Sequence, residues 1–424
     1  MIRNYPALQE EIRSAVLPNG LRVYYIPKPD FQKTFAMLAA DFGSVDCCFT
    51  LDGEQHQVTP GVAHFLEHKM FEEEDGNALQ KFTMLGAQPN AFTSHTMTAY
   101  HFTATERFEE CLEILLRFVT TPYFTDENVA KEKGIIGQEI SMLDDTPSWQ
   151  AYVGVLQGLY GAHTVRISIA GSKQTIAPIT PDLLHLCHRA FYSPANLVLV
   201  VCGTCDFDRV CEMAECITPK QSARIASRSY GEETPEAAQP MQVRRMAVSR
   251  PTFILGIKDT VPSDSYRRQL MGELAARCVC CESAPLYETL YQNNLIDQSF
   301  DPDYFTFPEG ACAMFSGESR NPEAVRDALL EEIRSIAAHG VDRALFERAR
   351  RQLLGLKLRS ADDPGSICRM QAEACFTGAS CFDFYEILTA VTTEEIEARI
   401  REWAEPDRIS LMVIAPAETE GAHG

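Results

Sequence analysis

Two stretches of the sequence share one plan, and this repeat limits what the chain can fold into. Residues 106–147 and residues 321–365 each predict two amphipathic helices joined by a turn and followed by a pair of aspartates. Each half also closes with a predicted helix and an apolar strand, LVLVVCG in the first half and ISLMVIA in the second. Strands and helices that alternate in duplicated halves predict two related α/β domains in tandem, each a sheet layer packed against helices.

The polar segment between the two halves marks a domain boundary. Residues 218–243 contain several prolines and little hydrophobic periodicity, as is typical of a linker. A chain of 424 residues is also too long for one compact core. We therefore expect an N-terminal domain over residues 1–217, this linker, and a related C-terminal domain over residues 244–424.

Charge and composition exclude several classes of partner. A net charge of −21 argues against nucleic acid, which requires a basic surface. No apolar run is long enough to span a membrane, and acidic residues stand where an export signal would be apolar. The fifteen cysteines lie mostly in apolar contexts, and the CxxC pair Cys202 and Cys205 has no second pair at zinc-site spacing. We expect reduced thiols and a cytoplasmic protein.

The stretch GVAHFLEHKMF, residues 61–71, is the candidate for chemistry. Its apolar residues recur at helical spacing, so His64 and His68 share one helix face and can chelate one divalent ion. Glu67 lies beside the same face, where a general base can take a proton from a metal-bound water. The alternative is a core helix with two incidental histidines.

A third metal ligand is expected from the segment DENVAKEKGIIGQEISM. Glu132 and Glu139 are seven residues apart and therefore share a helix face. Surface ion pairing is the alternative, and it is favoured for Glu132 taken alone. When the two halves are aligned on their aspartate pairs, Lys357 stands opposite Glu139 and Arg350 opposite Glu132. The acidic residues thus occur only in the half that carries the histidines, which favours a metal site there and none in the C-terminal domain.

Residues 88–104, QPNAFTSHTMTAYHFTA, predict a turn at Pro89-Asn90 followed by a strand. An edge strand beside a metal site could hold an extended peptide by main-chain hydrogen bonds. An ordinary amphipathic strand explains this segment equally well.

Together, HFLEH, GQEISM and NAFTSHTMTAY resemble the motifs of the inverzincin metallopeptidases of the pitrilysin and mitochondrial-processing-peptidase type, in their half-length bacterial branch. The resemblance implies half of a clamshell, and a zinc-dependent endopeptidase that cleaves peptides or unfolded segments. It implies that His64, His68 and Glu139 bind one Zn²⁺ per chain, that Glu67 activates a zinc-bound water, and that Glu132 orients a ligand. It further implies that substrate backbone is bound at Asn90, Ala91, Phe92 and Thr93.

One departure from the family pattern concerns the C-terminal half. Active members use an arginine and a tyrosine there, and this chain has Tyr291 and Asp297 at the matching positions of LYQNNLID. We therefore expect a heterodimer with a paralogous chain that supplies the Arg/Tyr pair, with a homodimer as the alternative. The alternative function is a non-catalytic structural or assembly subunit of the same fold.

Overall fold

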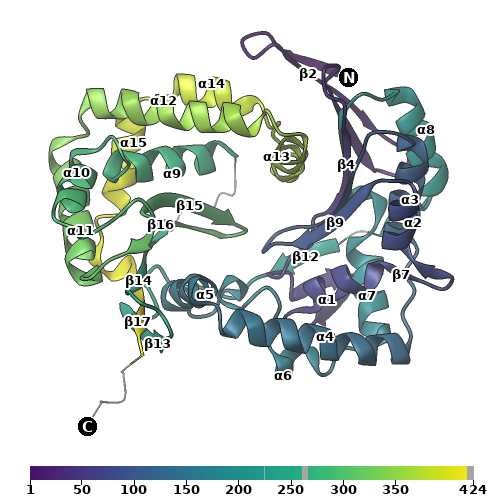
Figure 1. Ribbon diagram of the computed structural model, residues 1–424, viewed down its shortest axis with the longest axis horizontal. Coiled ribbons are helices and arrows are strands. Elements are labelled where there is room, and N and C mark those ends of the chain that lie inside the picture. The colour runs from purple at the N-terminus through teal and green to yellow at the C-terminus, as the bar shows by residue number, and fades with distance from the viewer. Residues whose placement is uncertain (224, 260–265, 418–424) are drawn as a thin grey trace. The chain divides into compact units, whose positions relative to one another are not determined.

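The computed structural model describes residues 1–223, 225–259 and 266–417, and these fold into two compact units (Figure 1). Each unit collects segments from distant parts of the sequence. Unit 1 comprises Met1–Ile140, Ser168–Tyr230 and Arg359–Phe382, and unit 2 comprises Ser141–Ile167, Gly231–Leu358 and Asp383–Gly424. In the described ranges, no helix has both the length and the apolar character needed to cross a bilayer.

Unit 1 is built on a seven-stranded sheet with the order β1-β2-β3-β11-β4-β10-β9. Strand β11 runs parallel to β3 and antiparallel to β4, and both β4 and β11 are buried along their whole length. Their continuous apolar runs reflect this burial on both faces. The strands are β1 (Ile2–Tyr5), β2 (Glu10–Val16), β3 (Arg22–Pro27), β4 (Thr34–Ala40), β9 (Gln88–Thr93), β10 (Thr98–Ala104) and β11 (Leu197–Gly203).

Helices and two small sheets complete unit 1. The small sheets are β12-β5-β6, formed by Ile225–Ser229, Cys48–Leu51 and Glu54–Gln57, and the β7-β8 hairpin of Glu72–Glu73 and Gly76–Asn77. The helices are α1 (Val62–Met70), α2 (Ala78–Met84), α3 (Phe108–Thr120), α4 (Asp126–Asp144), α6 (Lys173–Ile176), α7 (Pro181–Phe191), η2 (Pro194–Asn196), α8 (Phe207–Ile217) and α13 (Pro364–Phe376). The boundary with unit 2 falls in the last turn of α4.

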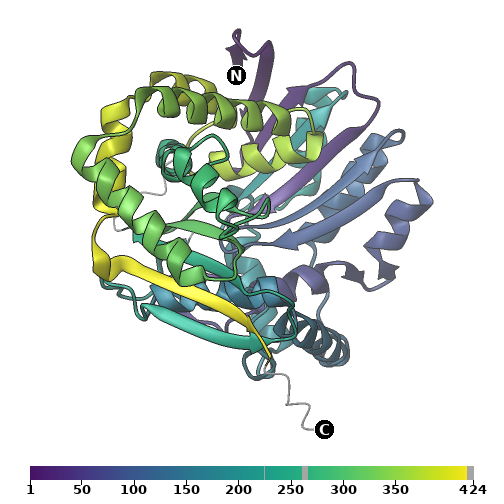
Figure 2. The same ribbon diagram turned by 60° about the vertical axis from the view of Figure 1, so that its left-hand side comes forward.

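Unit 2 is built on a five-stranded sheet with the order β13-β17-β14-β16-β15. Figure 2 shows its C-terminal strand β17, in yellow, beside the parallel strand β13, in teal. The strands are β13 (Met241–Met246), β14 (Thr252–Asp259), β15 (Asp301–Phe307), β16 (Gly310–Glu318) and β17 (Ile409–Pro416). The helices are α5 (Pro147–Leu159), η1 (Thr164–Arg166), α9 (Tyr266–Val279), α10 (Pro285–Gln292), α11 (Pro322–His339), α12 (Arg343–Ser360), α14 (Asp383–Ala390), α15 (Thr393–Glu402) and η3 (Pro406–Arg408).

The internal repeat is present in the strand order of the two sheets. The series β3-β11-β4-β10-β9 in unit 1 and β13-β17-β14-β16-β15 in unit 2 have the same neighbours in the same relative directions. The predicted helix pairs are also present, as α3 and α4 in one half and α11 and α12 in the other. The predicted fold class, two tandem domains of sheet and helices, is confirmed.

The units differ from the expected contiguous domains because two helices are exchanged. Helix α5 follows the first aspartate pair in the sequence but packs on β14 and β17 of unit 2. Helix α13 follows the second aspartate pair but packs on β11 and β4 of unit 1, where Arg22 donates a hydrogen bond to the Cys375 carbonyl. An amphipathic pattern shows that a helix has an apolar face without showing which sheet covers that face.

Two local expectations also differ from the structure. The expected linker contains β12, and β13 begins within it, while its residue Arg224 lies outside the described residues, as do 260–265 and 418–424 of the expected second domain. Residues 88–104 form a hairpin rather than a turn and one strand. Pro89 lies inside β9, which tolerates proline because it is an edge strand, and the turn is made by Ser94, which donates to the Met97 carbonyl.

All fifteen cysteines are free thiols, and eleven of them are buried. Cys202 is buried in β11, and burial raises the pKa of the Cys205 thiol to about 12. A thiol with so high a pKa carries little thiolate, which is the reactive form. The two cysteines of the CxxC pair therefore serve packing, and their environment does not favour redox or metal chemistry.

His188 gives a test of how burial affects stability. Its ring is buried on α7, Nε2 donates to the Val119 carbonyl at 3.0 Å, and burial lowers its pKa to about 4. The unfolded chain takes up this proton near pH 6.5, so it binds more protons than the folded chain as the pH falls. The stability from this group is thus complete above pH 6.5 and lost as pH falls toward 4. The free energy of unfolding, measured with urea at a series of pH values, should depend less steeply on pH in His188→Gln than in the parent. The difference in slope should reach up to about 1.4 kcal/mol per pH unit. Identical slopes in parent and variant would contradict this assignment.

Candidate metal centre

The helix that carries the HxxEH motif begins at a position that only glycine can occupy. Gly61 precedes α1 with φ of 92°, and a Cβ there would lie 2.7 Å from the Ala170 carbonyl oxygen. Gly171 also has a positive φ, and a Cβ there would lie 2.6 Å from the Pro60 carbonyl oxygen. Two left-handed glycines thus allow two backbone segments to touch, which fixes where α1 starts and how it is aimed.

The two histidines of α1 lie on one face, as their spacing predicts, with ring centroids 4.7 Å apart. Glu139 of α4 faces both rings: its Oε1 lies 3.5 Å from His64 Nε2 and its Oε2 lies 3.5 Å from His68 Nε2. One ligand atom from each of these three residues lies within 4.8 Å of the others. The two segments that bring these side chains together are separated by about seventy residues of sequence.

Glu132 lies one step further from the centre, behind His68. Its Oε1 accepts from His68 Nδ1 at 3.1 Å, so the imidazole directs Nε2 toward Glu139. Burial opposes ionisation of Glu132, but the hydrogen bond and charge of His68 outweigh it and lower the pKa of Glu132. Burial likewise opposes protonation of His68, yet the bond to Glu132 and the nearby carboxylates raise its pKa.

Glu67 is buried on α1 and is held by a hydroxyl from the neighbouring strand. The Thr93 hydroxyl donates to Glu67 Oε2 at 2.6 Å, which leaves Oε1 free of that bond. Burial is the largest influence on this carboxyl group and raises its pKa above the usual value. A carboxylate that is partly withdrawn from water and aimed beside two imidazoles has the character of a general base.

The residues expected to bind substrate lie on β9, an edge strand of the first sheet that contacts α1 (Figure 1). Strand β9 pairs with β10 on one side, with Asn90 opposite His101 and Phe92 opposite Ala99. Asn90 is exposed, and Ala91, Phe92 and Thr93 are half-buried. The expectation of an edge strand beside the motif helix therefore matches the arrangement in unit 1.

The donor set fits a zinc ion in chemistry and in spacing. Two imidazoles and one carboxylate are a common set of ligands in catalytic zinc sites, with a fourth position left open. Bonds of about 2.1 Å at tetrahedral angles separate two ligand atoms by about 3.4 Å, and both histidine-to-Glu139 distances are 3.5 Å. Among the residues that the structure describes, the group of histidine, cysteine, aspartate or glutamate side chains with metal-binding spacing is His64, His68 and Glu139, which lie in unit 1.

A buried histidine of unit 2, and the two residues at the expected Arg/Tyr positions, have other surroundings. His163 is buried with both ring nitrogens bonded: Nδ1 accepts from the Val165 amide, and Nε2 lies 2.9 Å from the Pro308 carbonyl. Tyr291 is exposed on α10, where it stacks on Tyr287. Asp297 accepts hydrogen bonds from the backbone and the hydroxyl of Ser299. The contacts of His163 therefore hold the structure of unit 2 together.

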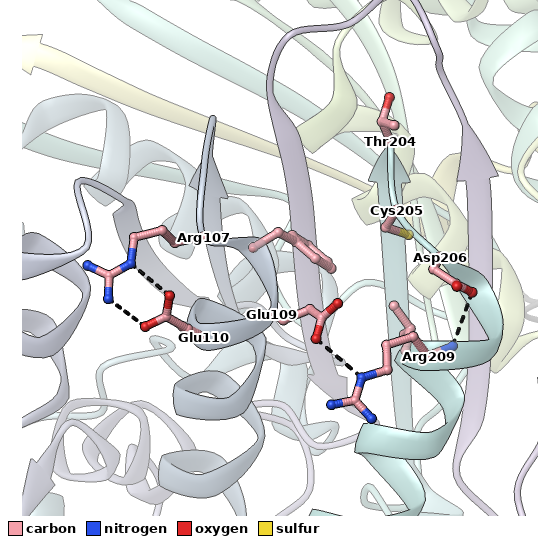
Figure 3. Close-up of a pocket in the computed structure, with 9 residues that line it drawn as sticks. Arg107, Glu109, Glu110, Thr204, Cys205, Asp206 and Arg209 are labelled. Atoms are coloured by element: carbon pink, nitrogen blue, oxygen red, sulfur yellow. Dashed lines mark hydrogen bonds and ion pairs between the residues drawn. The ribbon is translucent and has the colours of Figure 1, made fainter.

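A separate hollow of about 480 Å³ lies between the starts of α3 and α8 and contains none of the predicted site residues (Figure 3). Its charged side chains are paired with each other. Arg107 binds Glu110, and Arg209 donates to Glu109 at 3.2 Å. Asp206 caps the first turn of α8. These groups are engaged in the fold and give the hollow no arrangement for chemistry.

Comparison with known proteins points to one protein family. The model of "Insulinase (Peptidase family M16)" matches residues 54–172, and that of "Peptidase M16 inactive domain" matches residues 178–353. A Bacillus subtilis protein with the name "Uncharacterized zinc protease YmfH" is 35% identical over 97% of this chain and 98% of its own length. The chain belongs to peptidase family M16.

Solved structures place this M16 chain among the half-length members of the family. An M16-like peptidase from Alicyclobacillus acidocaldarius is 31% identical, with a TM-score of 0.93 over 98% of this chain and 100% of its own. Pitrilysin shares the fold, with 16% identity and a TM-score of 0.76, and this chain covers 45% of it. The predicted family resemblance is therefore confirmed.

Two features of the M16 site were not predicted from the sequence. The first is the bond from the Thr93 side chain to Glu67, because Thr93 was expected to act through its backbone. The second is the complete burial of Lys69 beside the ligands. A lysine within the apolar run HFLEHKMF was a visible signal for the second, whereas the first required the register of β9 against α1.

Proposed function

We propose that this M16 protein is a zinc-dependent endopeptidase that cleaves peptides or unfolded segments. The observation that carries the proposal is the convergence of His64, His68 and Glu139 in unit 1, with the Glu67 carboxyl group close enough to all three to interact with their charges. Membership of a peptidase family and the names of its zinc-protease relatives support the same reading. In this proposal the three converging residues hold one Zn²⁺ per chain.

The reaction uses the protein groups in defined roles. When bound, Zn²⁺ is a Lewis acid that acidifies a water molecule and polarises the carbonyl of the peptide bond. The carboxylate of Glu67 takes a proton from the attacking water and then delivers it to the amine of the leaving peptide. Glu132 keeps the His68 imidazole oriented, through the Nδ1 bond at 3.1 Å. Thr93 keeps Glu67 oriented through its hydroxyl.

We propose that substrate backbone adds to the free side of β9 at Asn90, Ala91, Phe92 and Thr93. The edge position of β9 and its contact with α1 support this, because an extended peptide can continue a sheet through main-chain hydrogen bonds. This mode of binding favours peptides and unfolded segments, since folded domains seldom offer an unpaired strand.

Thr93→Val should lower kcat by about tenfold and leave KM within about twofold, because the hydroxyl holds the base while the backbone of β9 is unchanged. Thr93→Ser keeps the hydroxyl and should retain most of the parent rate. The measurement is steady-state cleavage of a quenched fluorescent peptide by the three proteins. A rise in KM with kcat unchanged would assign Thr93 to substrate binding in place of base positioning.

The first test of the proposed function is the zinc content of the purified chain, by elemental analysis, together with cleavage of quenched fluorescent peptides. About one zinc per chain with peptide cleavage is the expected result. A protein that binds no zinc and cleaves nothing would favour the alternative, a structural or assembly subunit of the same fold.

We propose further that the active form is a heterodimer with a paralogous M16 chain that supplies an arginine and a tyrosine. The presence of Tyr291 and Asp297 at the matching positions supports this, since neither side chain is a cation that could stabilise an oxyanion. Adding such a chain should raise the cleavage rate by orders of magnitude. Full activity in the isolated chain, or in its homodimer, would contradict the heterodimer.

A cytoplasmic location is proposed from the cysteines. Fifteen free thiols, most of them buried in the two cores, suit a reducing compartment. Detection of the chain by immunoblot in the culture medium or an envelope fraction, and its absence from the cytosolic fraction, would overturn this.

A further inference from the structure

Lys69 is the one residue of α1 whose charge and burial have not entered the proposed mechanism. It follows His68 directly, and its side chain is 0% exposed. Lysine is almost never fully buried unless its charge is paired, because an ammonium group loses strong hydration when it leaves water. The surroundings of Lys69 must therefore supply compensating negative charge.

Two carboxylates surround the buried ammonium group. Glu72 Oε2 lies 2.6 Å from Lys69 Nζ, and Glu132 Oε2 lies 3.7 Å from it. Glu72 belongs to the β7-β8 hairpin and Glu132 to α4, so Lys69 joins three elements of unit 1. The shorter contact, to Glu72, holds the ammonium group at the end of α1. The longer contact brings its positive charge to Glu132, the hydrogen-bond partner of His68.

The two oxygens of Glu132 thus have different partners. Oε1 accepts from His68 Nδ1 at 3.1 Å, whereas Oε2 faces the Lys69 ammonium group at ion-pair distance. An ion pair at Oε2 limits rotation of the Glu132 carboxylate and so keeps Oε1 in place to accept from His68. Glu132 is itself only 5% exposed, so bulk solvent screens its contact with Lys69 very little.

We propose that Lys69 is a positioning residue of the metal centre, which holds Glu132 so that it orients the His68 imidazole toward the metal. The inference rests on the proposed zinc site, and it assigns the site a further supporting group outside its ligands. Partners of this kind commonly change metal affinity even though they never touch the metal.

The test is zinc affinity, measured by competition with a chelating indicator dye on the full chain. Lys69→Met removes the charge and keeps a side chain of similar length, and it should weaken zinc binding by about ten- to a hundredfold. Glu72→Gln is the matched control: its amide oxygen can still accept a hydrogen bond from the buried Lys69 ammonium group, so Lys69 stays in place facing Glu132 and zinc affinity should stay within about threefold of the parent. Equal losses in the two variants would show that Lys69 acts only by tying the hairpin to α1, which overturns the proposal.

A double-mutant cycle separates positioning from general destabilisation. If Lys69 acts through Glu132, the variant Lys69→Met/Glu132→Gln should bind zinc within about twofold of Glu132→Gln alone. If the double variant instead loses zinc affinity by the product of the two single-variant losses, Lys69 acts independently of Glu132 and the proposal is overturned. The visible absorption spectrum of the Co²⁺-substituted protein should also change in Lys69→Met, because His68 is reoriented, and should be unchanged in Glu72→Gln.

Folding of each apo variant is checked by circular dichroism before titration. If Lys69→Met does not fold, Lys69→Gln replaces it, and zinc affinity equal to that of the parent in this variant overturns the proposal. A parent that binds zinc but cleaves no peptide leaves these readouts intact and contradicts only the proposed catalysis. A parent that binds no zinc overturns the metal centre and this inference together.

Discussion

Replacing Glu67 with glutamine is expected to lower kcat by about 10²- to 10⁴-fold while about one zinc per chain is retained. Glutamine has nearly the shape of glutamate and can still accept the hydrogen bond from Thr93, which lies 2.6 Å from Oε2. It cannot take a proton from water. The substitution therefore removes the general base without removing a ligand, since the three converging ligands are His64, His68 and Glu139.

The control for this prediction is Glu74→Gln, which removes a carboxylate from an exposed position in the turn of the β7-β8 hairpin. It should leave kcat within about twofold of the parent, as is usual for surface changes. Peptide cleavage and elemental analysis are carried out on all three proteins. If Glu67→Gln keeps more than about a tenth of the parent rate, Glu67 is not the general base.

His68→Ala is expected to abolish zinc binding, with a loss of affinity of at least about a hundredfold and no measurable cleavage. His68 is both a converging ligand and the partner of Glu132, so its removal leaves two ligands and a buried carboxylate without its hydrogen-bond donor. Zinc should also stabilise the parent against unfolding, by about 1.4 kcal/mol for each tenfold excess over Kd. This stabilisation should be absent from His68→Ala.

His185→Ala is the matched control for the loss of a histidine. His185 is exposed on α7, where its ring packs beside Phe124, and it is outside the ligand cluster. Thermal unfolding with and without a chelator should show the same zinc-dependent shift in this variant as in the parent. A zinc-dependent shift that persists in His68→Ala would contradict the assignment of this ligand.

Much of the site could be predicted because residue spacings within two helices set much of its geometry. A four-residue spacing on α1 fixes the relation of His64 to His68 whatever surrounds them, and a seven-residue spacing on α4 does the same for Glu132 and Glu139. The sequence could not show that Lys69 is fully buried, because burial depends on α4 and the β7-β8 hairpin closing around it. Nor could it show that the Thr93 hydroxyl meets Glu67, which requires the placement of β9 against α1.

The fold was predictable to a similar depth. Apolar runs and amphipathic periods indicated which segments are strands and helices, and the repeat indicated that two related units exist. Local signals were less informative about pairing. Pro89-Asn90 has the composition of a turn, yet it continues β9 because an edge strand tolerates a missing amide. The choice of sheet for α5 and α13 depends on contacts across more than a hundred residues, which no local pattern contains.

The exchange of α5 and α13 has a consequence for how the chain matures on the ribosome. Most of unit 1 has been synthesised by Tyr230, but its sheet lacks α13 until translation reaches Phe382. At about 5–20 residues per second, the roughly 150 residues in between take about 8–30 seconds. During that time the surface of β4 and β11 that α13 will cover is open to solvent and to other nascent chains. Neither gene half, expressed alone, encodes a complete unit, so fragments divided at the linker should become soluble only when they are produced together.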